Sequence, residues 1–416
     1  MDSDKGKLDS FSFSAERPIS RDDEDLLGHV RVADTLVSII TRAQTPLTVG
    51  LYGEWGSGKT GVINLIAKRL ASMKIPTAYV DCWKYEGSEG LVLPLFASLA
   101  EDRTAPEMRS FSKVVGTLLL CGADVGLHAA TFGALRLKDV KENLGEIEGR
   151  ILQKVDAVGR VQEEFKKAVE QVATGDRFII FVDNLDRCRP ENAVSLLESV
   201  RNLLAVEKCV FVIAVDDAVL ISYIDQKYSG TKVDGKKYLE KVVDFPYAVP
   251  NPTAGSITGL VSTLFSKILP PPIVDSETKL VLETLRNYTQ PLNPRTLRKA
   301  LVRYAVLRLT KDRSDRAPFV LALLYEMHPR FLEWFARSSL PLRGVFNSFI
   351  KEEHSPGGKS MKDILKDVVP PEYLSDPQLK NFLRTFETIL YDRGKFAPCL
   401  KDLAECGLPD LHPTDS

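Results

Sequence analysis

Continuously apolar runs alternate with amphipathic stretches along the first part of the chain. The segments 47–52 (LTVGLY), 178–183 (FIIFVD) and 209–215 (CVFVIAV) are almost entirely apolar, as strands buried on both faces are. In 61–73 and 194–206, apolar residues instead recur at helical spacing. Strands that alternate with helices predict an α/β fold in which helices cover both faces of a mostly parallel sheet.

The pattern changes in the second part of the chain, where proline- and glycine-containing linkers precede segments that are nearly all helical. We therefore expect a flexible polar arm at 1–17 and a core domain at 18–250 that contains a helical insertion at 104–171. A helical lid is expected at 251–312 and a C-terminal helical region at 313–416.

A glycine-rich turn separates the first apolar run from the amphipathic stretch after it. Gly53 is followed by Gly58-Lys59-Thr60 in the Walker A pattern G-x-x-x-x-G-K-[ST]. In such a loop, backbone N–H groups and a helix N-terminus bind phosphate. Lys59 is expected to reach the β- and γ-phosphates, and Thr60 to bind Mg²⁺. The predicted nucleotide-binding residues are Gly53, Glu54, Trp55, Gly56, Ser57, Gly58, Lys59, Thr60 and Gly61.

Aspartates follow the next two apolar runs. Asp183 ends one run and is expected to bind Mg²⁺ together with Thr60, as a Walker B carboxylate does. Asp186 either polarises the attacking water or, with Arg187, holds the turn. Asp216, at the end of the next run, either orients the water or caps the following helix. The sequence therefore predicts a site for ATP and Mg²⁺.

One short motif bears on the choice of nucleotide. The stretch TKVD at 231–234 matches a loose guanine-reading pattern. It lies in a polar loop and not at the end of a strand, so we interpret the match as chance. ATP is the expected nucleotide.

A basic stripe marks the predicted lid. Asn293 is expected to cap a helix, and Arg295 in its first turn is the candidate that senses the γ-phosphate. Lys299 and Arg303 follow at i+4 spacing on the same helix face. Such a stripe is usually solvated, and the alternative is contact with nucleic acid.

Composition adds few constraints. Lys and Arg total 55 and Asp and Glu total 56, so the formal net charge of −1 does not by itself indicate a binder of nucleic acid or membrane surfaces. The six cysteines contain no C-x-x-C pair, which fits the reduced thiols of a cytoplasmic protein. Cys399, Cys406 and His412 lack zinc-site spacing and a fourth ligand. The N-terminal stretch has no secretory signal pattern.

The apolar stretch within 111–136 has two interpretations. Asp124 and His128 interrupt it, and its unbroken part is shorter than a membrane span requires. We expect a buried helical hairpin, and peripheral membrane contact is the alternative.

These segments together resemble the KAP family of P-loop NTPases. The segments that carry the resemblance are GLYGEWGSGKT (50–60), DCWKYEGSEGLVLPLFASL (81–99), FVDNLDRC (181–188), YLEKVVDFPYAVPNP (238–252) and LNPRTLRKAL (292–301). The resemblance extends from about residue 18 to 309. It implies an ASCE-like P-loop NTPase with a helical lid and tail. The family often carries a pair of transmembrane helices between the two Walker motifs, and residues 111–136, which occupy that place, would be a soluble remnant of the pair.

The resemblance also implies roles for individual residues. Lys59 and Thr60 would bind phosphate and Mg²⁺, Asp183 would bind Mg²⁺, and Arg295 would act as the lid sensor. Asn184 stands where many members have a second acid, which shifts water activation to Asp186 or weakens it.

Related ring-forming ATPases place an arginine finger before the last strand of the sheet. This chain has lysines there, of which Lys241 is the candidate for catalysis between subunits of a homo-oligomer. A solvated lysine cluster is the alternative.

The function expected from these features is ATP hydrolysis that drives a conformational change. The resemblance suggests an antiviral defence protein that regulates a separately encoded effector. The alternatives are a switch that does not hydrolyse ATP, an ATP-dependent nucleic-acid binder, and a membrane-localised form.

Overall fold

The computed structural model describes residues 17–88, 90–101, 106–120, 159–173, 175, 177–311, 313–337, 369–390 and 393–405. They form two compact units that divide between Pro250 and Asn251. Most of the predicted arm and residues 121–158 of the predicted insertion lie outside the described residues, as do Cys406 and His412. The part of the chain before Asn251 is called the sheet unit, and the part from Asn251 the helical unit.

Five parallel strands form the centre of the sheet unit, in the order β2-β3-β4-β1-β5. They are β1 (Leu47–Tyr52), β2 (Thr77–Asp81), β3 (Phe178–Asp183), β4 (Cys209–Val215) and β5 (Phe245–Ala248). Every residue of β3 and β4 is buried, which explains their continuously apolar sequences. Strand β4 lies between the strand that precedes the glycine-rich turn and the strand that ends in Asp183.

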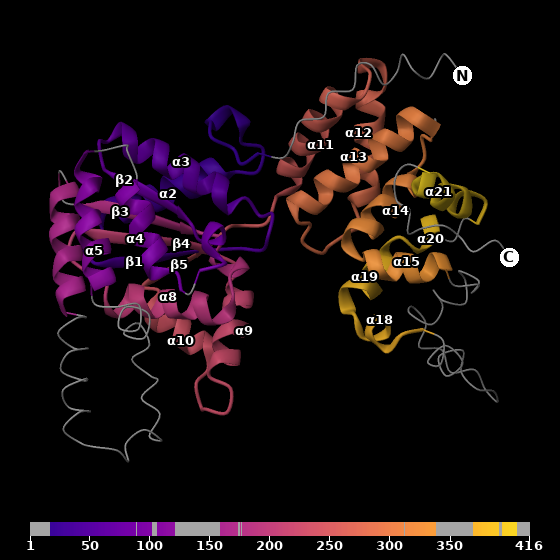
Figure 1. Ribbon diagram of the computed structural model, residues 1–416. Helices are drawn as coiled ribbons and strands as arrows, with labels where there is room; N and C mark the ends of the chain where they lie inside the picture. Colours follow the sequence, from indigo (N-terminus) through magenta and orange to yellow (C-terminus); the bar gives the residue numbers. More distant parts are fainter. Residues whose placement is uncertain are drawn as a thin grey trace. The chain divides into compact units, whose positions relative to one another are not determined.

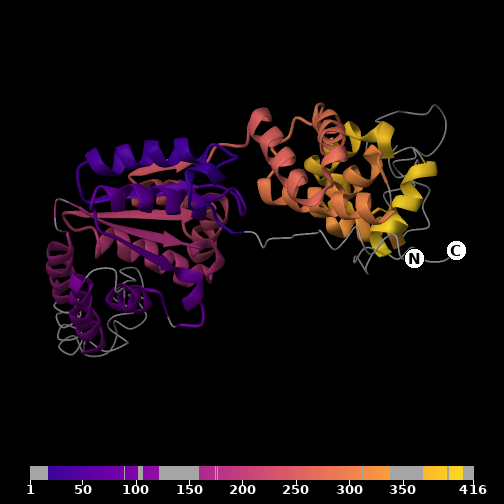
Figure 2. The same cartoon turned by 90° about the horizontal axis from the view of Figure 1, so that it is seen from above.

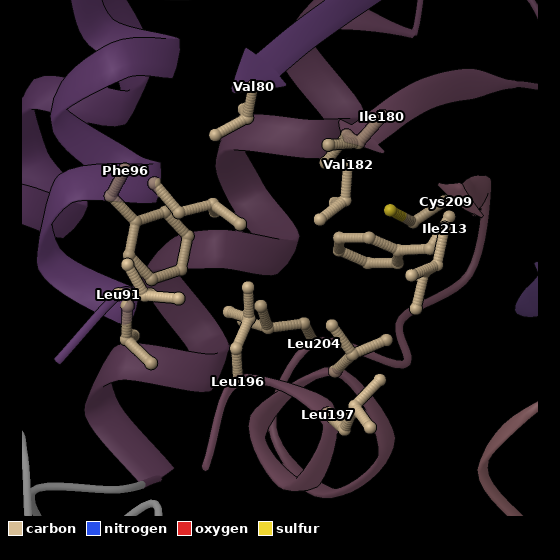
Figure 3. Close-up of a cluster of buried hydrophobic side chains, with 14 of the residues drawn as sticks. Val80, Leu91, Phe96, Ile180, Val182, Leu196, Leu197, Leu204, Cys209 and Ile213 are labelled. Carbon is tan, nitrogen blue, oxygen red and sulfur yellow. The ribbon is translucent and has the colours of Figure 1, made fainter. Parts of the chain in front are cut away.

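Helices cover both faces of this sheet, as Figures 1 and 2 show. Alternate residues of each strand point to opposite faces, so Phe181 joins the core beneath α2 and α3 while Val182 joins the core on the other side. Figure 3 shows part of the second core, a cluster of buried side chains that includes Val182 and Ile213 of the sheet, Phe96 of α4 and Leu196 of α8. The helices whose bounds the structure describes in this unit are α2 (His29–Arg42), α3 (Lys59–Ser72), α4 (Val92–Glu101), α5 (Phe111–Leu120), α8 (Pro190–Asn202), α9 (Asp217–Lys227) and α10 (Gly235–Val242), and 159–172 are also helical. The predicted α/β fold is confirmed.

Helix α10 corrects one part of the sequence interpretation. The stretch 231–234 was expected to lie in a polar loop, but the chain is helical from Gly235 to Val242 directly after it, and β5 begins at Phe245. Asp234 begins the helix because its Oδ1 accepts the backbone N–H of Lys237 at 3.0 Å. Asp234 belongs to the guanine-like stretch, so a structural role accounts for this residue.

The helical unit has a core of its own, and the described part of this unit consists mainly of helices (Figure 1). The large buried side chains of this core include Phe265, Tyr304, Phe319 and Phe382. The helices are α11 (Ala254–Ile268), α12 (Pro271–Leu285), α13 (Pro294–Lys311), α14 (Arg316–Met327), α15 (Pro329–Arg337), α18 (Pro371–Ser375), α19 (Pro377–Thr385), α20 (Glu387–Leu390) and α21 (Arg393–Glu405). This confirms the helical character predicted for the C-terminal part of the chain.

The stretch considered for membrane contact is described only in part. Its first residues form α5, whereas 121–136 lie outside the described residues. Within the described ranges, no helix combines the length and the apolar character that a membrane crossing needs.

Candidate functional site

The glycine-rich turn joins β1 to α3 at the carboxyl edge of the sheet. Gly56 and Gly58 have φ values of +90° and +98°, a backbone conformation that glycine adopts without steric cost. A Cβ on Gly58 would lie 2.2 Å from Cε1 of His29, so this glycine is also required by a close neighbour. Helix α3 begins at Lys59, which places its N-terminus at the loop.

Lys59 lies inside this loop. Its side chain is buried, and its Nζ donates to the carbonyl oxygens of Gly53 at 2.6 Å and Glu54 at 3.2 Å. Burial lowers the pKa of the Lys59 ammonium from its ordinary value, while the charges of nearby aspartates oppose this shift. The ammonium therefore lies where a phosphate chain could replace carbonyl oxygens as its acceptor.

Thr60 and Asp183 meet across 123 residues of sequence. Thr60 Oγ1 donates to Asp183 Oδ2 at 2.8 Å, and the Tyr79 hydroxyl donates to the same oxygen at 3.0 Å. Asp183 is 1% exposed, and burial raises the pKa of its carboxyl while these hydrogen bonds and the charge of Lys59 oppose the rise. A carboxylate beside a hydroxyl offers the hard oxygen ligands that Mg²⁺ prefers, so these residues fit the predicted metal site.

Asp186 connects the phosphate loop to the end of β4. Its Oδ2 accepts the indole Nε1–H of Trp55 at 2.7 Å and the backbone N–H of Asp216 at 2.9 Å. The side chain is 2% exposed. Asp186 thus holds two neighbouring segments together, and this oxygen is occupied by two donors.

Asp216 and Asn184 also have structural partners. Asp216 caps α9, because its Oδ1 accepts the backbone N–H of Val219 at 3.4 Å. Burial raises the pKa of the Asp216 carboxyl. Asn184 adopts a φ of +58° and donates from Nδ2 to Asp81 Oδ1 at 2.9 Å. The Asn184 side chain therefore stabilises the contact between the ends of β2 and β3.

His29 is a neighbour of the loop that the sequence did not reveal. Its buried ring lies with Nε2 3.0 Å from the Ser57 carbonyl oxygen. Asp25 holds the start of α2, because its carboxylate accepts the backbone N–H groups of Leu27, Gly28, His29 and Val30. Burial lowers the pKa of His29, although the charge of Asp25 opposes this shift. The signal in the sequence was Asp25, four residues before His29, because an aspartate at this place is typical of the start of a helix.

Two more unpredicted side chains gather beside Trp55. The guanidinium carbon of Arg187 lies 5.7 Å from the ring centroid of Trp55 and 4.9 Å from that of Trp83. Trp83 belongs to the 3₁₀ turn η2 (Cys82–Tyr85) that follows β2. The cation therefore stacks against one ring from the phosphate loop and one from the neighbouring strand end.

Of the two remaining predicted residues, one belongs to the sheet unit and the other to the helical unit. Lys241 is exposed on α10, ahead of β5. Arg295 belongs to the helical unit, where its backbone N–H is bound by Asn293 Oδ1 at 3.0 Å, the predicted cap. Their assigned roles in sensing or catalysis stay predictions. Lys299 and Arg303 both pair with Glu326, which gives the basic stripe a structural use within its own unit.

Comparison of sequences relates the chain to known proteins. A family model described as the KAP family P-loop domain matches residues 30–309. The phage T7 exclusion protein of Escherichia coli (strain K12) is 25% identical over 256 residues, which are 56% of this chain and 34% of that protein. The ORC1-type DNA replication protein 2 of Thermoplasma acidophilum is 22% identical over 246 residues, which are 58% of this chain and 46% of that protein. The chain thus spans less than half the length of these curated relatives.

Comparison of structures finds a weaker likeness. The Aeropyrum pernix ORC2 protein, in its ADPNP-ADP complexes, matches over 97% of this chain and 98% of its own, with 11% sequence identity and a TM-score of 0.40. A score at this level supports no argument about function.

Proposed function

This chain belongs to the KAP family of P-loop NTPases, and we propose that it is a Mg²⁺-dependent ATPase whose nucleotide cycle controls a partner protein. The hydrogen bond between Thr60 and Asp183 carries the proposal, because it joins the residues that Walker A and Walker B motifs use for the metal. Lys59, held 2.6 Å from a loop carbonyl, supplies the phosphate-binding cation.

In the proposed reaction, loop N–H groups and Lys59 bind the β- and γ-phosphates and hold the γ-phosphate for in-line attack by water. Bound Mg²⁺ would neutralise charge on the phosphate oxygens, with Thr60 and Asp183 as its protein ligands. Asp216 is the candidate that orients the water, since Asp186 already accepts two N–H donors on Oδ2. ATP is the proposed nucleotide.

The proposed biological role is phage exclusion through a separately encoded effector. It is supported by the printed name of the Escherichia coli relative and by family membership. Effector activity that did not change with ATP, in a complex copurified from the native host, would remove this part of the proposal.

Turnover of ATP tests the enzymatic part. We expect Mg²⁺-dependent hydrolysis that falls at least about 100-fold in Lys59→Ala and Asp183→Ala, since each removes a group that stabilises phosphoryl charge. Lys68→Ala is the matched control, because Lys68 is exposed on the same helix as Lys59. Equal turnover in all four proteins would contradict the proposal. Turnover per molecule that rises with protein concentration would support a homo-oligomer.

A second function is favoured by one observation. Asn184 occupies the position after Asp183 and is bonded to Asp81, so no second carboxylate follows the Walker B aspartate directly. A nucleotide-dependent switch with negligible hydrolysis would bind ATP tightly and show no turnover. Binding of ATP and its hydrolysis must therefore be measured separately.

A further inference from the structure

Arg187 occupies a particular position beside the phosphate loop. It ends the 3₁₀ turn η5 (Leu185–Arg187), four residues after Asp183 ends β3. Its guanidinium stacks against Trp55, which is itself a residue of the phosphate loop. The turn after β3 therefore places a cation directly beside the phosphate loop.

The two indole rings are unusually exposed for their size. Trp55 is 51% and Trp83 is 55% exposed, although large aromatic side chains are generally well buried. Trp55 is nonetheless fixed in orientation, because its Nε1–H donates to the buried carboxylate of Asp186. The pair is thus a preorganised and open platform for the guanidinium.

The guanidinium has unused hydrogen-bonding capacity. Across the described ranges of the chain, its N–H groups have no hydrogen-bond or ion-pair partner, although arginine carries five donors in one plane. The cation–π contact with the two rings gives these donors no hydrogen-bond acceptor. Arg189, two residues later, differs because its Nε pairs with Glu86 at 3.3 Å.

The charge of Arg187 lies close to the phosphate loop. Its guanidinium carbon is 5.7 Å from the ring centroid of Trp55 in that loop, which also holds the ammonium of Lys59. An anion bound between these two positive charges would reduce the repulsion between them. A triphosphate is such an anion.

We propose that Arg187 is a catalytic residue whose guanidinium binds the γ-phosphate of ATP from within the same chain, with Trp55 and Trp83 as its positioning residues. This inference rests on the proposed ATPase function. During hydrolysis the water oxygen bonds to the γ-phosphorus while the bond from that phosphorus to the β–γ bridging oxygen breaks. ADP and inorganic phosphate form and the proton of the water is released. Arg187 stabilises the charge on the transferred group and is itself unchanged.

The variant Arg187→Gln tests this role, with Arg189→Gln as the matched control that removes the same charge from the adjacent ion pair. Arginine fingers contribute about 10³- to 10⁵-fold to kcat, so we expect Arg187→Gln to lower kcat at least about 100-fold. Affinity for ADP should change less than about threefold, because ADP lacks the γ-phosphate. The control should hydrolyse ATP as the wild type does.

A binding readout keeps the test valid if hydrolysis is slow. The ratio of ATP affinity to ADP affinity, measured by titration in the presence of Mg²⁺, should fall about tenfold in Arg187→Gln and stay unchanged in Arg189→Gln. Equal ratios and equal kcat values in these two variants would overturn the inference. If wild-type protein bound no ATP, or bound it as well after Lys59→Ala, the proposed function itself would fail.

Trp83 provides a second test, since it lies outside the phosphate loop. Trp83→Ala should lower kcat about tenfold through a misplaced guanidinium, and Trp83→Phe should restore most of it by keeping a ring face. Unchanged ADP affinity in both variants would separate positioning from a folding defect. Equal kcat values in Trp83→Ala and the wild type would show that Trp83 does not position Arg187.

Discussion

The two units bury carboxylates with different partners. In the helical unit, Glu277 is 3% exposed and accepts the Nε–H of Arg308 at 2.8 Å, so a buried anion faces a cation. At the carboxyl edge of the sheet, Asp183 and Asp186 are buried as deeply. Their donors are hydroxyl, indole and backbone N–H groups, all of them neutral.

This difference fits the proposed function, in which the carboxylates at the edge of the sheet lie at a site for nucleotide and Mg²⁺. A buried ion pair is satisfied by itself, and loss of one partner leaves an unpaired charge. Carboxylates held by neutral donors keep their negative charge available for a cation such as Mg²⁺. The sheet unit also has an ion pair on its helices, Glu198 with Lys227 at 2.8 Å, so the contrast belongs to the site and not to the fold class.

The largest loss of stability is expected when one partner of the buried ion pair is removed. Glu277→Ala removes the buried carboxylate that accepts from the Arg308 guanidinium and the Tyr304 hydroxyl, and should lower the free energy of unfolding by about 3–5 kcal/mol. Urea denaturation of the full chain measures this loss. Glu283→Ala, on the same helix, breaks a pair with Arg316 in which both side chains are about half exposed, and should cost less than about 1 kcal/mol. Similar losses in the two variants would contradict the contrast.

A smaller loss of stability is expected when Asp186 is changed, because its carboxylate accepts hydrogen bonds from neutral donors. Asp186→Asn keeps the size of the side chain but weakens the bonds from Trp55 and Asp216, and should cost about 1.5–3 kcal/mol of unfolding free energy. Turnover should fall only through weaker ATP binding. A loss of kcat above about 100-fold with unchanged stability would instead identify Asp186 as the residue that activates water. Trp55→Phe is the control, because it removes only the indole donor from the same contact.

Much of the sheet unit could be predicted because strands that are buried on both faces have continuously apolar sequences. The run at 47–52 became β1 with the same bounds, and FIIFVD became β3. Helix α10 was missed because its sequence, GKKYLEKV, is mostly polar and follows a loop-like stretch. Asp234 before it, with Leu239 and Val242 buried on one face, was the signal that could have revealed the helix.

The candidate site was less predictable than the fold. Local motifs identified Lys59, Thr60 and Asp183 as candidates, since each lies in a pattern a few residues long. Most contacts that complete the site join distant parts of the chain: Thr60 and Asp183 are 123 residues apart, Tyr79 and Asp183 are 104 apart, and Trp55 and Asp186 are 131 apart. Such contacts depend on strand order and on which way a side chain points, and a single sequence does not record either.

A third prediction concerns Tyr79, whose hydroxyl is a neutral donor to Asp183, the proposed Mg²⁺ ligand. Tyr79→Phe removes the hydroxyl that orients Asp183, and should raise the Mg²⁺ concentration needed for half-maximal ATP turnover about tenfold. Turnover at saturating Mg²⁺ should be nearly normal, because Thr60 still holds the carboxylate. Tyr247→Phe, on the strand at the opposite edge of the sheet, is the matched control. An unchanged Mg²⁺ requirement would show that Tyr79 does not orient this ligand.

The smallest effect concerns pH, and each unit contains one histidine suited to the measurement. Burial lowers the pKa of His29 beside the phosphate loop and of His328 in the helical unit, while Asp25 and Asp376 respectively oppose the shift. Both rings therefore stay neutral in the folded protein at pH values where the unfolded chain takes up a proton. Stability contributed this way is present above the unfolded pKa of about 6.5 and is lost as the pH falls below it.

The loss from each ring should reach at most about 1.4 kcal/mol at pH 5.5. His29→Gln and His328→Gln each remove one titrating ring, so each should flatten the fall in melting temperature between pH 7.5 and 5.5. Only His29 lies against the phosphate loop, 3.0 Å from the Ser57 carbonyl oxygen. His29→Gln should therefore also change the pH dependence of ATP affinity, whereas His328→Gln should leave it as in the wild type. If the pH dependence of ATP affinity changed equally in both variants, the position of His29 beside the phosphate loop would have no specific effect on ATP binding.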